Sequence, residues 1–316
     1  MRLEVGRATR LVPLREIAVN PTRLFILTLV AMVAFASNSL LCRAALKHTS
    51  IDAASFTLIR ICSGAAALGL IMGFRRRLMV ERSFDSSPVT RHSSLPQAGN
   101  WLSALALFGY AAAFSFAYNT LPAGTGALLL FGAVQATMIL WGWRTGERLH
   151  ARQLFGLVLA AGGLVLLVLP GLSAPPFVGS SLMLGAGVAW GIYSLRGKGE
   201  KMPASATAGN FLRAVPFALL LSAIFFPWMR FDRAGIGYAV LSGAIASGAG
   251  YVIWYAALAD LKATSAATVQ LSVPVLAATG GILLLGEPLT LRYLCASVAV
   301  LGGIALVVIE PPRRPV

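Results

Sequence analysis

Long apolar runs separated by short polar segments make up most of the chain. A helix that crosses about 30 Å of hydrocarbon needs roughly 20 mainly apolar residues, and each run has about that length. Charged residues, Pro and Gly mark the ends of the runs, as in connections between helices. The pattern predicts an all-α, polytopic membrane protein with about ten transmembrane helices. The expected helix cores are Leu24–Leu41, Ala53–Phe74, Trp101–Leu121, Thr125–Trp143, Leu154–Leu169, Val178–Leu195, Ala208–Trp228, Gly237–Leu258, Thr264–Leu285 and Tyr293–Ile309.

The composition supports a membrane environment for the whole chain. Hydrophobic residues make up 57% of the sequence and charged residues 12%, and the mean hydropathy is +0.78. A water-soluble core cannot enclose that much apolar surface, so the lipid bilayer is the expected solvent.

The chain also contains an internal duplication. The segment GERL that begins at Gly146 matches GEPL that begins at Gly286, 140 residues later, and the pair Gly162–Gly163 matches Gly302–Gly303 in the same register. Repeated units that are almost entirely apolar indicate a duplicated membrane unit rather than a soluble repeat protein.

The first part of each half matches at a different spacing, 153 residues, with Arg43 on Arg196 and Arg60 on Arg213. A longer polar loop at 75–100, basic and rich in Ser and Pro, explains the change of spacing, and we expect it to be flexible. The predicted organisation is a basic N-terminal segment at 1–23, a first five-helix repeat at 24–170, a second at 171–310 and a tail at 311–316.

An odd number of spans in each half has a geometric consequence. The second copy must cross the membrane in the opposite sense to the first, which gives two inverted five-helix repeats. Inverted repeats around a site at the membrane midplane are typical of transporters that work by alternating access.

The net charge of +15 is distributed along the chain in a way that indicates topology rather than nucleic-acid binding. With the N-terminus in the cytoplasm, 19 basic residues lie in predicted cytoplasmic segments and 5 in outer segments. The positive-inside rule then predicts that both termini are cytoplasmic. The basic segments would contact anionic membrane lipids, and no nucleic-acid partner is expected.

Three segments resemble a known family: FASNSLLCRAAL, then SFTLIR, and VQLSVPVLAATGGILLLGEPLTLRYLCASVAVLGGIALVVI near the C-terminus. They are similar to the drug/metabolite transporter superfamily, and specifically to its EamA-type members. The resemblance implies a carrier or exporter of small organic molecules, with a cavity lined by the first, third, fourth, sixth, eighth and ninth spans. One departure from symmetry is Pro274, which corresponds to Val134.

Polar and aromatic residues within those spans are the candidates for the substrate pathway, because amides in hydrocarbon need hydrogen-bond partners. Each of them is also suited to an interhelical hydrogen bond. Together they indicate a pocket for an uncharged, zwitterionic or amphipathic solute. The candidates are Asn38, Tyr110, Gln135, Trp190, Tyr193, Tyr251, Trp254 and Gln270.

Two pairs of charged residues occupy equivalent positions in the repeats. Glu147 and Glu287 each follow a glycine at the end of a span. They could gate the pathway or carry protons. We favour a structural role, in which each carboxylate caps the helix that follows.

Arg60 and Arg213 lie about two turns inside their spans, roughly 10 Å deep. We expect each guanidinium to snorkel to the interface, or to pair with a loop carboxylate such as Asp52. The alternative is that they hold a carboxylate or phosphate of the substrate.

The leading hypothesis is a secondary transporter of the inner membrane that exports small organic metabolites, amino-acid-like or amphipathic. The outward direction rests on the resemblance alone. A nucleotide-sugar or phosphorylated-metabolite exchanger of the same fold is the alternative, with the two arginines binding the anion. Compact loops and the lack of an organellar leader lead us to expect a bacterial plasma membrane, and the sequence leaves open whether a homodimer forms.

An integral-membrane enzyme acting on a lipid is less favoured, because no paired acids, metal-ligand histidines or activated nucleophile cluster in the sequence. Cys42, Cys62 and Cys295 lack the spacing of a zinc site, and the chain has no phosphate-binding loop. We therefore expect no enzymatic activity, no metal and no cofactor, and a gradient as the energy source.

Overall fold

The computed structural model describes most of the chain, and all structural statements below concern the described part. The described residues are 21–83, 99–146, 150–170, 174–197, 200, 202–258, 260–261 and 269–308, without the side chains of 75, 76 and 78–83. Most of the predicted N-terminal segment, much of the predicted loop at 75–100, the start of the ninth span and the predicted tail lie outside the described residues.

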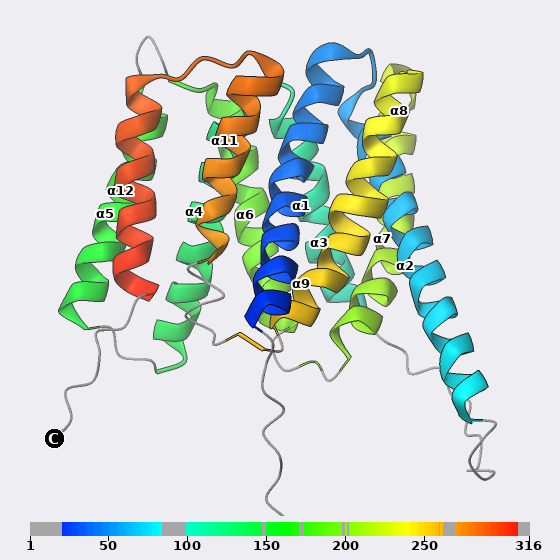
Figure 1. Cartoon of the computed structure of the whole chain (residues 1–316). Coiled ribbons are helices and arrows are strands. Elements are labelled where there is room, and N and C mark those ends of the chain that lie inside the picture. Colours follow the sequence, from blue (N-terminus) through cyan, green and yellow to red (C-terminus); the bar gives the residue numbers. More distant parts are fainter. Residues whose placement is uncertain are drawn as a thin grey trace, which may run out of the picture.

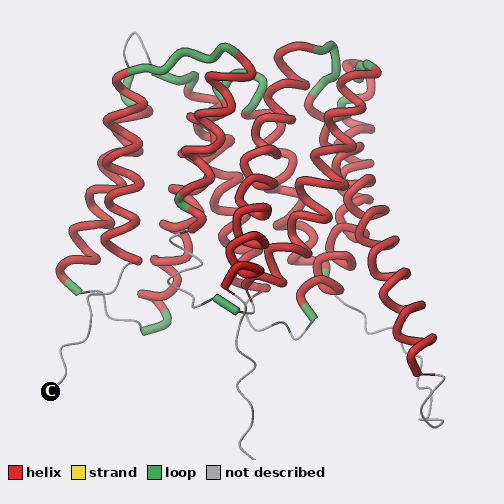
Figure 2. The backbone as a smooth tube through the Cα atoms, in the orientation of Figure 1, coloured by secondary structure: helices red, strands yellow, loops and turns green. Residues whose placement is uncertain are grey.

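Ten helical crossings run between two layers of connecting loops (Figures 1 and 2). The first repeat contains α1 (Pro21–His48), α2 (Ala53–Ser83), α3 (Trp101–Ala117), α4 (Ala123–Arg144) and α5 (Ala151–Val168). The second contains α6 (Phe177–Gly197), α7 (Pro203–Ile224), the short 3-10 helix η1 (Phe226–Trp228), α8 (Arg233–Val240), η2 (Leu241–Ala249), α9 (Gly250–Leu258), α11 (Ser272–Leu285) and α12 (Leu291–Val308). The segments α8, η2 and α9 follow one another without a break and form one crossing.

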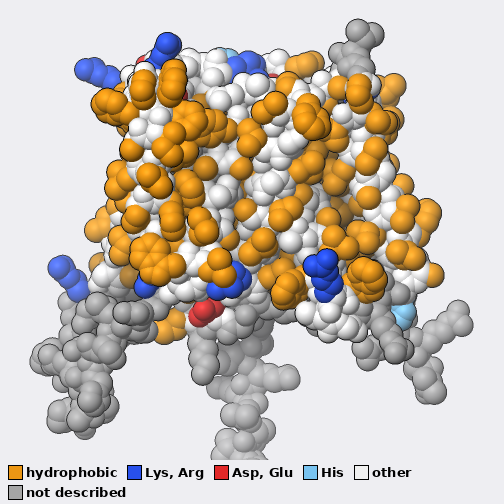
Figure 3. Space-filling model, turned by 180° about the vertical axis from the view of Figure 1, so that it is seen from behind, with side chains coloured by type: hydrophobic (Ala, Val, Ile, Leu, Met, Phe, Trp, Pro, Cys, Tyr) orange, Lys and Arg blue, Asp and Glu red, His pale blue; other side chains and the backbone are white. Residues whose placement is uncertain are grey.

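The described helices have the lengths and surfaces of a membrane protein. Eight helical segments are long and apolar enough to cross a bilayer, and α3 and α11 are shorter apolar helices. On the face seen in Figure 3, exposed apolar side chains cover the helices between the two ends of the molecule, and basic side chains lie near those ends. The prediction of an all-α, polytopic membrane protein is confirmed.

The helices of the two repeats interdigitate. Helix α1 packs on α9, η2 and α11 of the second repeat, and its equivalent, α6, packs on α3 and α4 of the first. The equivalent pairs α2 with α7, α4 with α11, and α5 with α12 also pack on each other. These contacts give the two inverted repeats a pseudo-two-fold relation.

The first residues of α1 and the last residues of α12 lie at the same end of the bundle (Figure 1). We call it the Arg196 end, because α6 finishes there. The opposite end, where α1 finishes, is the Arg43 end.

Several helix ends differ from the predicted spans, and two of these differences have a clear physical cause. Helix α2 continues to Ser83, past the predicted end at Phe74 and into the segment expected to be a loop. The extension contains Arg, Leu, Met and Glu, which are strong helix formers even outside the membrane. In the ninth span, helical residues at 269–270 are interrupted by a turn at Leu271 before α11 begins. The ring of Pro274 conflicts with the carbonyl of Gln270, four residues earlier, which explains the interruption.

Glycines bring α5 and α12 close together. A β-carbon on Gly156 would collide with the carbonyl of Gly303, and one on Gly163 would collide with Ala299 and Val300. In the two repeat-equivalent pairs, Gly162–Gly163 and Gly302–Gly303, Gly163 and Gly303 have this role, since a β-carbon on Gly162 or Gly302 would meet open space. Close backbone approach of this kind is a common way to hold helices together in lipid.

Candidate functional site

A small cavity lies between helices of the two repeats. Its volume is about 20 Å³, room for about one water molecule, so the helices are closed around it. Five of the six spans that the resemblance assigned to the cavity contribute, and the ninth, α11, supplies no described lining residue. The lining residues are Phe35, Asn38 and Ser39 of α1, Tyr110 and Phe114 of α3, Leu130 and Phe131 of α4, Trp190 of α6, Ala246 of η2 and Tyr251 of α9.

Aromatic rings form much of the wall. The ring of Trp190 lies 4.8 Å from that of Tyr110 and 5.2 Å from that of Tyr251, measured between centroids. On the other side of Tyr251, the ring of Phe35 lies 5.8 Å away, and Trp254 packs on Phe35 at 5.9 Å. The rings present flat apolar faces with a negative quadrupole, which suits either an apolar group or a cation.

A hydrogen-bond network runs through the same wall. The amide of Asn38 donates to the hydroxyl oxygen of Tyr110 at 3.1 Å and accepts from the hydroxyl of Ser242 at 2.5 Å. The same Tyr110 oxygen accepts from the guanidinium of Arg60 at 2.9 Å, and Arg60 also makes a longer contact with Ser247 at 3.4 Å. The network joins α1, α2 and α3 to η2, so it couples both repeats at the cavity.

Arg60 is buried, with 1% of its surface exposed. Its guanidinium carbon lies 5.1 Å from the ring centroid of Tyr110 and 4.9 Å from that of Phe114. The expected snorkelling is therefore wrong for Arg60. A centrally buried arginine costs about 2.5 to 3.5 kcal/mol on insertion scales, and these rings and hydroxyls offset part of that cost.

The expected pairing of Arg60 with Asp52 is also wrong. Asp52 instead caps α2, where its carboxylate accepts from the backbone N–H groups of Ala54 and Ser55, and it also accepts from the backbone of Arg230. Burial alone would raise the pKa of Asp52, but these hydrogen bonds outweigh it and hold the pKa below its ordinary value.

Arg213 does not join its repeat equivalent. It is half-buried on α7 and donates to the carbonyl of Gly209 on its own helix at 3.1 Å. It is not among the residues that line the cavity. The two arginines therefore do not form the joint anion site that the exchanger alternative required.

At the Arg43 end, an ion pair lies about one helical turn beyond Ser39, which lines the cavity. Nε of Arg43 lies 3.0 Å from Oε1 of Glu287, whose residue is 7% exposed. Arg43 also donates to the backbone carbonyls of Tyr118 and Asn119 at 2.9 and 3.2 Å. One cation thereby ties α1 to the end of α3 and to the turn between α11 and α12.

Glu287 caps a helix other than the one expected. Its Oε2 accepts from the backbone N–H of Ala123 at 2.7 Å, the first residue of α4, rather than from α12, which follows it in sequence. Two equivalent glycines make the sharp turns that precede Glu287 and Glu147: Gly286 has φ of 61° and Gly146 has φ of 97°. This left-handed region favours glycine. Glu147 itself lies outside the described residues.

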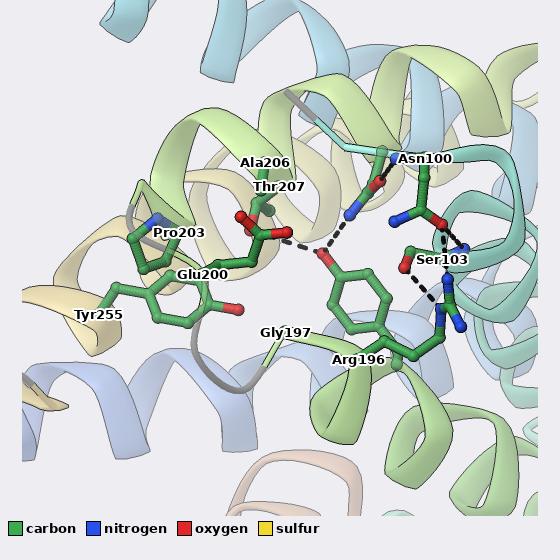
Figure 4. Close-up of a pocket in the computed structure, with 11 residues that line it drawn as sticks. Asn100, Ser103, Arg196, Gly197, Glu200, Pro203, Ala206, Thr207 and Tyr255 are labelled. Carbon is green, nitrogen blue, oxygen red and sulfur yellow. Dashed lines mark hydrogen bonds between the residues drawn. The ribbon is translucent and has the colours of Figure 1, made fainter. Parts of the chain in front are cut away.

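At the Arg196 end, the guanidinium of Arg196 donates to two neutral side chains (Figure 4). Nε of Arg196 donates to the hydroxyl of Ser103 at 3.0 Å, and Nη2 donates to the side-chain oxygen of Asn100 at 3.0 Å. The backbone of Asn100 in turn donates to Asn210 of α7 at 2.9 Å. A cavity of about 10 Å³ remains among these residues, next to Tyr193. Arg196 therefore ties α6 to the start of α3.

The predicted pathway residues occupy three different environments. Asn38, Tyr110, Trp190 and Tyr251 line the cavity, and Trp254 packs behind Phe35. Tyr193 belongs to the Arg196-end closure. Gln135 is buried in α4 and Gln270 is half-buried beside the turn before α11, and neither lines a described cavity.

Sequence reasoning did not identify several residues that shape the site. Phe35, Ser39, Phe114, Leu130, Phe131 and Ala246 also line the cavity. Arg43 and Arg196 are equivalent in the two repeats. That equivalence could have predicted that they occupy corresponding places at opposite ends of the bundle. The π-helix η2 carries Ser242 and Ser247, and neither the hydrophobic pattern nor a sequence motif predicts it. π-Helical turns are often found at functional sites.

Known proteins with similar sequences and folds agree with this architecture. Residues 177–309 match the EamA-like transporter family. An uncharacterized protein of Pseudomonas aeruginosa is 56% identical over 285 residues, 90% of this chain and 94% of that protein. The threonine/homoserine exporter RhtA of Salmonella typhimurium is 29% identical over 221 residues, 66% of this chain and 71% of that protein.

A solved crystal structure shares the fold, with a TM-score of 0.61 at 17% identity over 90% of this chain and 97% of that one. The fold agrees with inverted five-helix repeats, and the sequence matches extend over both. The chain belongs to the EamA-like transporter family of the drug/metabolite transporter superfamily.

Proposed function

We propose that this protein is a secondary transporter that exports small amino-acid-like metabolites across the bacterial inner membrane by alternating access. The observation that carries the proposal is the cavity bounded by both inverted repeats and closed separately at its two ends, by Arg43 and by Arg196. A carrier needs such an arrangement, because a solute must be released on one side while the other side stays shut.

The mechanism follows from the contacts. Opening the Arg43 end breaks the ion pair with Glu287 and the bonds to the carbonyls after α3. Opening the Arg196 end breaks the bonds to Asn100 and Ser103. With the N-terminus in the cytoplasm, the Arg196 end faces the cytoplasm and the Arg43 end faces outward. In export, the solute enters after the Arg196 end opens and leaves after the Arg43 end opens.

The amino-acid-like substrate class has two supports. The relative from Salmonella typhimurium is a threonine/homoserine exporter. The cavity combines aromatic faces with amide and hydroxyl groups, which suits a small zwitterion. The cavity must widen to take such a solute, so we place the described conformation between the two open states.

The test is transport by the full chain in inside-out vesicles, where export is measured as uptake. Radiolabelled threonine, homoserine and the other amino acids would be supplied with and without a proton gradient, beside vesicles without the protein. We expect saturable uptake of a subset of amino acids. Absence of uptake for the whole panel, with folded protein present in the vesicles, would contradict the proposal.

The variant that tests the cavity is Trp190→Ala, which removes the ring that contacts both Tyr110 and Tyr251. The control is Trp141→Ala, on the exposed surface of α4. We expect loss of uptake in the first and normal uptake in the second.

A further inference from the structure

The guanidinium of Arg60 lies behind two cavity-lining rings, Tyr110 and Phe114, and has unused hydrogen-bonding capacity there. Within the described part of the chain, its Nε and Nη1 have no hydrogen-bond partner, although the residue is 1% exposed. Only Nη2 is bonded, to Tyr110 and more distantly to Ser247. Buried donors of a charged group normally have partners, so two free ones next to a cavity wall mark a place for a ligand.

The neighbouring polar groups add further donors. The oxygen of Tyr110 already receives hydrogen bonds from Asn38 and Arg60, which leaves its own hydroxyl hydrogen to be donated. Tyr110 lines the cavity, and Arg60 lies directly behind it. A group of donors with one positive charge is complementary to an anion.

No described carboxylate neutralises Arg60. The acidic residues whose side chains the structure describes lie in loops or at helix ends, and Glu287, the most buried of them, pairs with Arg43. They are Asp52, Glu200, Asp232, Asp260 and Glu287. Within the described structure, the charge of Arg60 at the cavity is uncompensated by protein.

We infer that Arg60 is the carboxylate-binding residue of the cavity, and that the transported solute must carry a free carboxylate. The inference rests on the proposed function, since it names the group by which the exporter recognises its substrate. The carboxylate accepts from Nη1 of Arg60 and from the hydroxyl of Tyr110, whose oxygen is bonded to the neighbouring Nη2. The charge of the guanidinium strengthens these hydrogen bonds.

A carboxylate fits the site better than a phosphate does. One guanidinium balances one negative charge, and Arg213, which would supply a second, bonds to its own helix away from the cavity. The ammonium group of an amino acid would lie against the aromatic wall of Phe35, Trp190 and Tyr251, which attracts cations. The site therefore selects α-amino acids over amines and over phosphorylated metabolites.

The first experiment needs only the wild-type protein. Purified full-length protein in detergent is heated with L-amino acids, and the increase in Tm is followed as a function of concentration. Each acid that binds is compared with its carboxamide and with the amine that lacks the carboxyl group, and O-phospho-L-serine is tested beside L-serine. We expect the carboxamide and the amine to bind about tenfold more weakly than the acid.

The second experiment tests Arg60 itself. In Arg60→Gln we expect the acid to bind about as weakly as its carboxamide, so that the ~10-fold discrimination is lost. Arg60→Lys keeps the charge without the planar fork and should retain part of it. Arg213→Gln is the matched control and should discriminate like the wild type. Size-exclusion chromatography checks that each variant is folded.

The outcomes separate this inference from the proposed function. Carboxamides that bind as tightly as the acids, or undiminished discrimination in folded Arg60→Gln, would overturn the role of Arg60 while leaving export intact. Binding of O-phospho-L-serine above L-serine, or binding of no amino acid at all, would also overturn it. Discrimination that depends on Arg60 without any vesicle uptake would support the site and contradict the exporter. If Arg60→Gln and Arg60→Lys both fail to fold, the test is the wild-type comparison. Equal binding of acid and carboxamide would then overturn the inference.

Discussion

The two ends of the bundle are closed by arginines that occupy the same position in the two repeats, but the closures differ in kind. Arg43 pairs with a buried carboxylate and with two backbone carbonyls. Among the described residues, Arg196 bonds instead to the neutral side chains of Asn100 and Ser103. Helix α1 also continues one turn past Arg43 to Lys47, which donates to the carbonyl of Leu285.

The difference shows that a duplicated backbone does not preserve duplicated interactions. Breaking a buried ion pair costs about 3 to 5 kcal/mol, and a hydrogen bond from a charged group to a neutral partner contributes about 1.5 to 3 kcal/mol, so the Arg43 end is the more firmly closed. The inverted repeats supply two equivalent positions, and the partners at each position set how readily that end opens. Four predictions test this comparison, from the largest expected effect to the smallest.

Glu287→Gln should produce the largest change. Removal of one partner of a buried ion pair costs about 3 kcal/mol, so the fraction of molecules with the Arg43 end open should rise by a factor of about 100. The measurement is the rate at which a membrane-impermeant maleimide labels a Ser39→Cys reporter in the cavity wall. The native cysteines, Cys42, Cys62 and Cys295, are replaced by Ser.

Labelling should increase only from the side of the Arg43 end, which right-side-out and inside-out vesicles distinguish. Arg43→Gln should behave in the same way, since it removes the other member of the pair. Labelling that rises equally from both sides would indicate general loosening rather than the opening of one closure.

Arg196→Gln should have a smaller effect at the opposite end. Hydrogen bonds from a charged group to neutral partners contribute about 1.5 kcal/mol, so labelling of the same Ser39→Cys reporter from the Arg196 side should rise about tenfold. An increase as large as that of Glu287→Gln would contradict the ranking of the two ends.

Gly286→Ala and Gly146→Ala compare the equivalent turns. Both glycines have positive φ, which costs an alanine about 1 kcal/mol, and a β-carbon at either would meet no neighbour. We expect similar decreases in Tm from strain alone, measured by thermal unfolding in detergent. Only Gly286→Ala should also raise labelling of the reporter from the Arg43 side, because it displaces Glu287. Equal labelling in the two variants would show that the two turns support their closures to the same extent.

Asp52→Ala should give the smallest effect. Asp52 caps α2, whereas α7, the equivalent helix, begins at Pro203 without a side-chain cap, so the loss should be about 1 kcal/mol. The pKa of Asp52 is lowered on folding from its ordinary value of 3.8, so its ionised form stabilises the native state at pH above 3.8.

That contribution disappears as the pH falls below 3.8 and through the lower folded pKa. The difference in Tm between wild type and Asp52→Ala should therefore shrink in that acidic range and stay constant above it. If the Tm difference grew on acidification, the pKa of Asp52 would be raised on folding rather than lowered.

The sequence predicted the crossings well because lipid allows few alternatives. Every backbone group must be paired within its own helix, so apolar length alone identifies a span. The predictions were least accurate where that rule does not apply. Helix α2 extends into the aqueous region, where polar helix formers decide its end, and α11 restarts after Leu271 because of the ring of Pro274.

The candidate site was predicted only in part, for a different reason. Asn38, Tyr110, Trp190 and Tyr251 could be selected because a polar or amphipathic side chain in a span stands out. Phe131 could not, because an apolar residue on a span can face lipid as readily as a cavity. The burial of Arg60 depends on Tyr110, which lies 50 residues away in sequence, so no local pattern reveals it.

The interdigitation of the repeats has a consequence for how the protein is made. Among the described helices, α1 leaves the ribosome before the others, but it packs on α9, η2 and α11 of the second half. Membrane insertion proceeds from the N-terminus, so α1 must wait in lipid, with the amide of Asn38 exposed to hydrocarbon, until its partners are synthesised. The earliest of the described helices to enter the membrane is thus one of the last to reach its final neighbours.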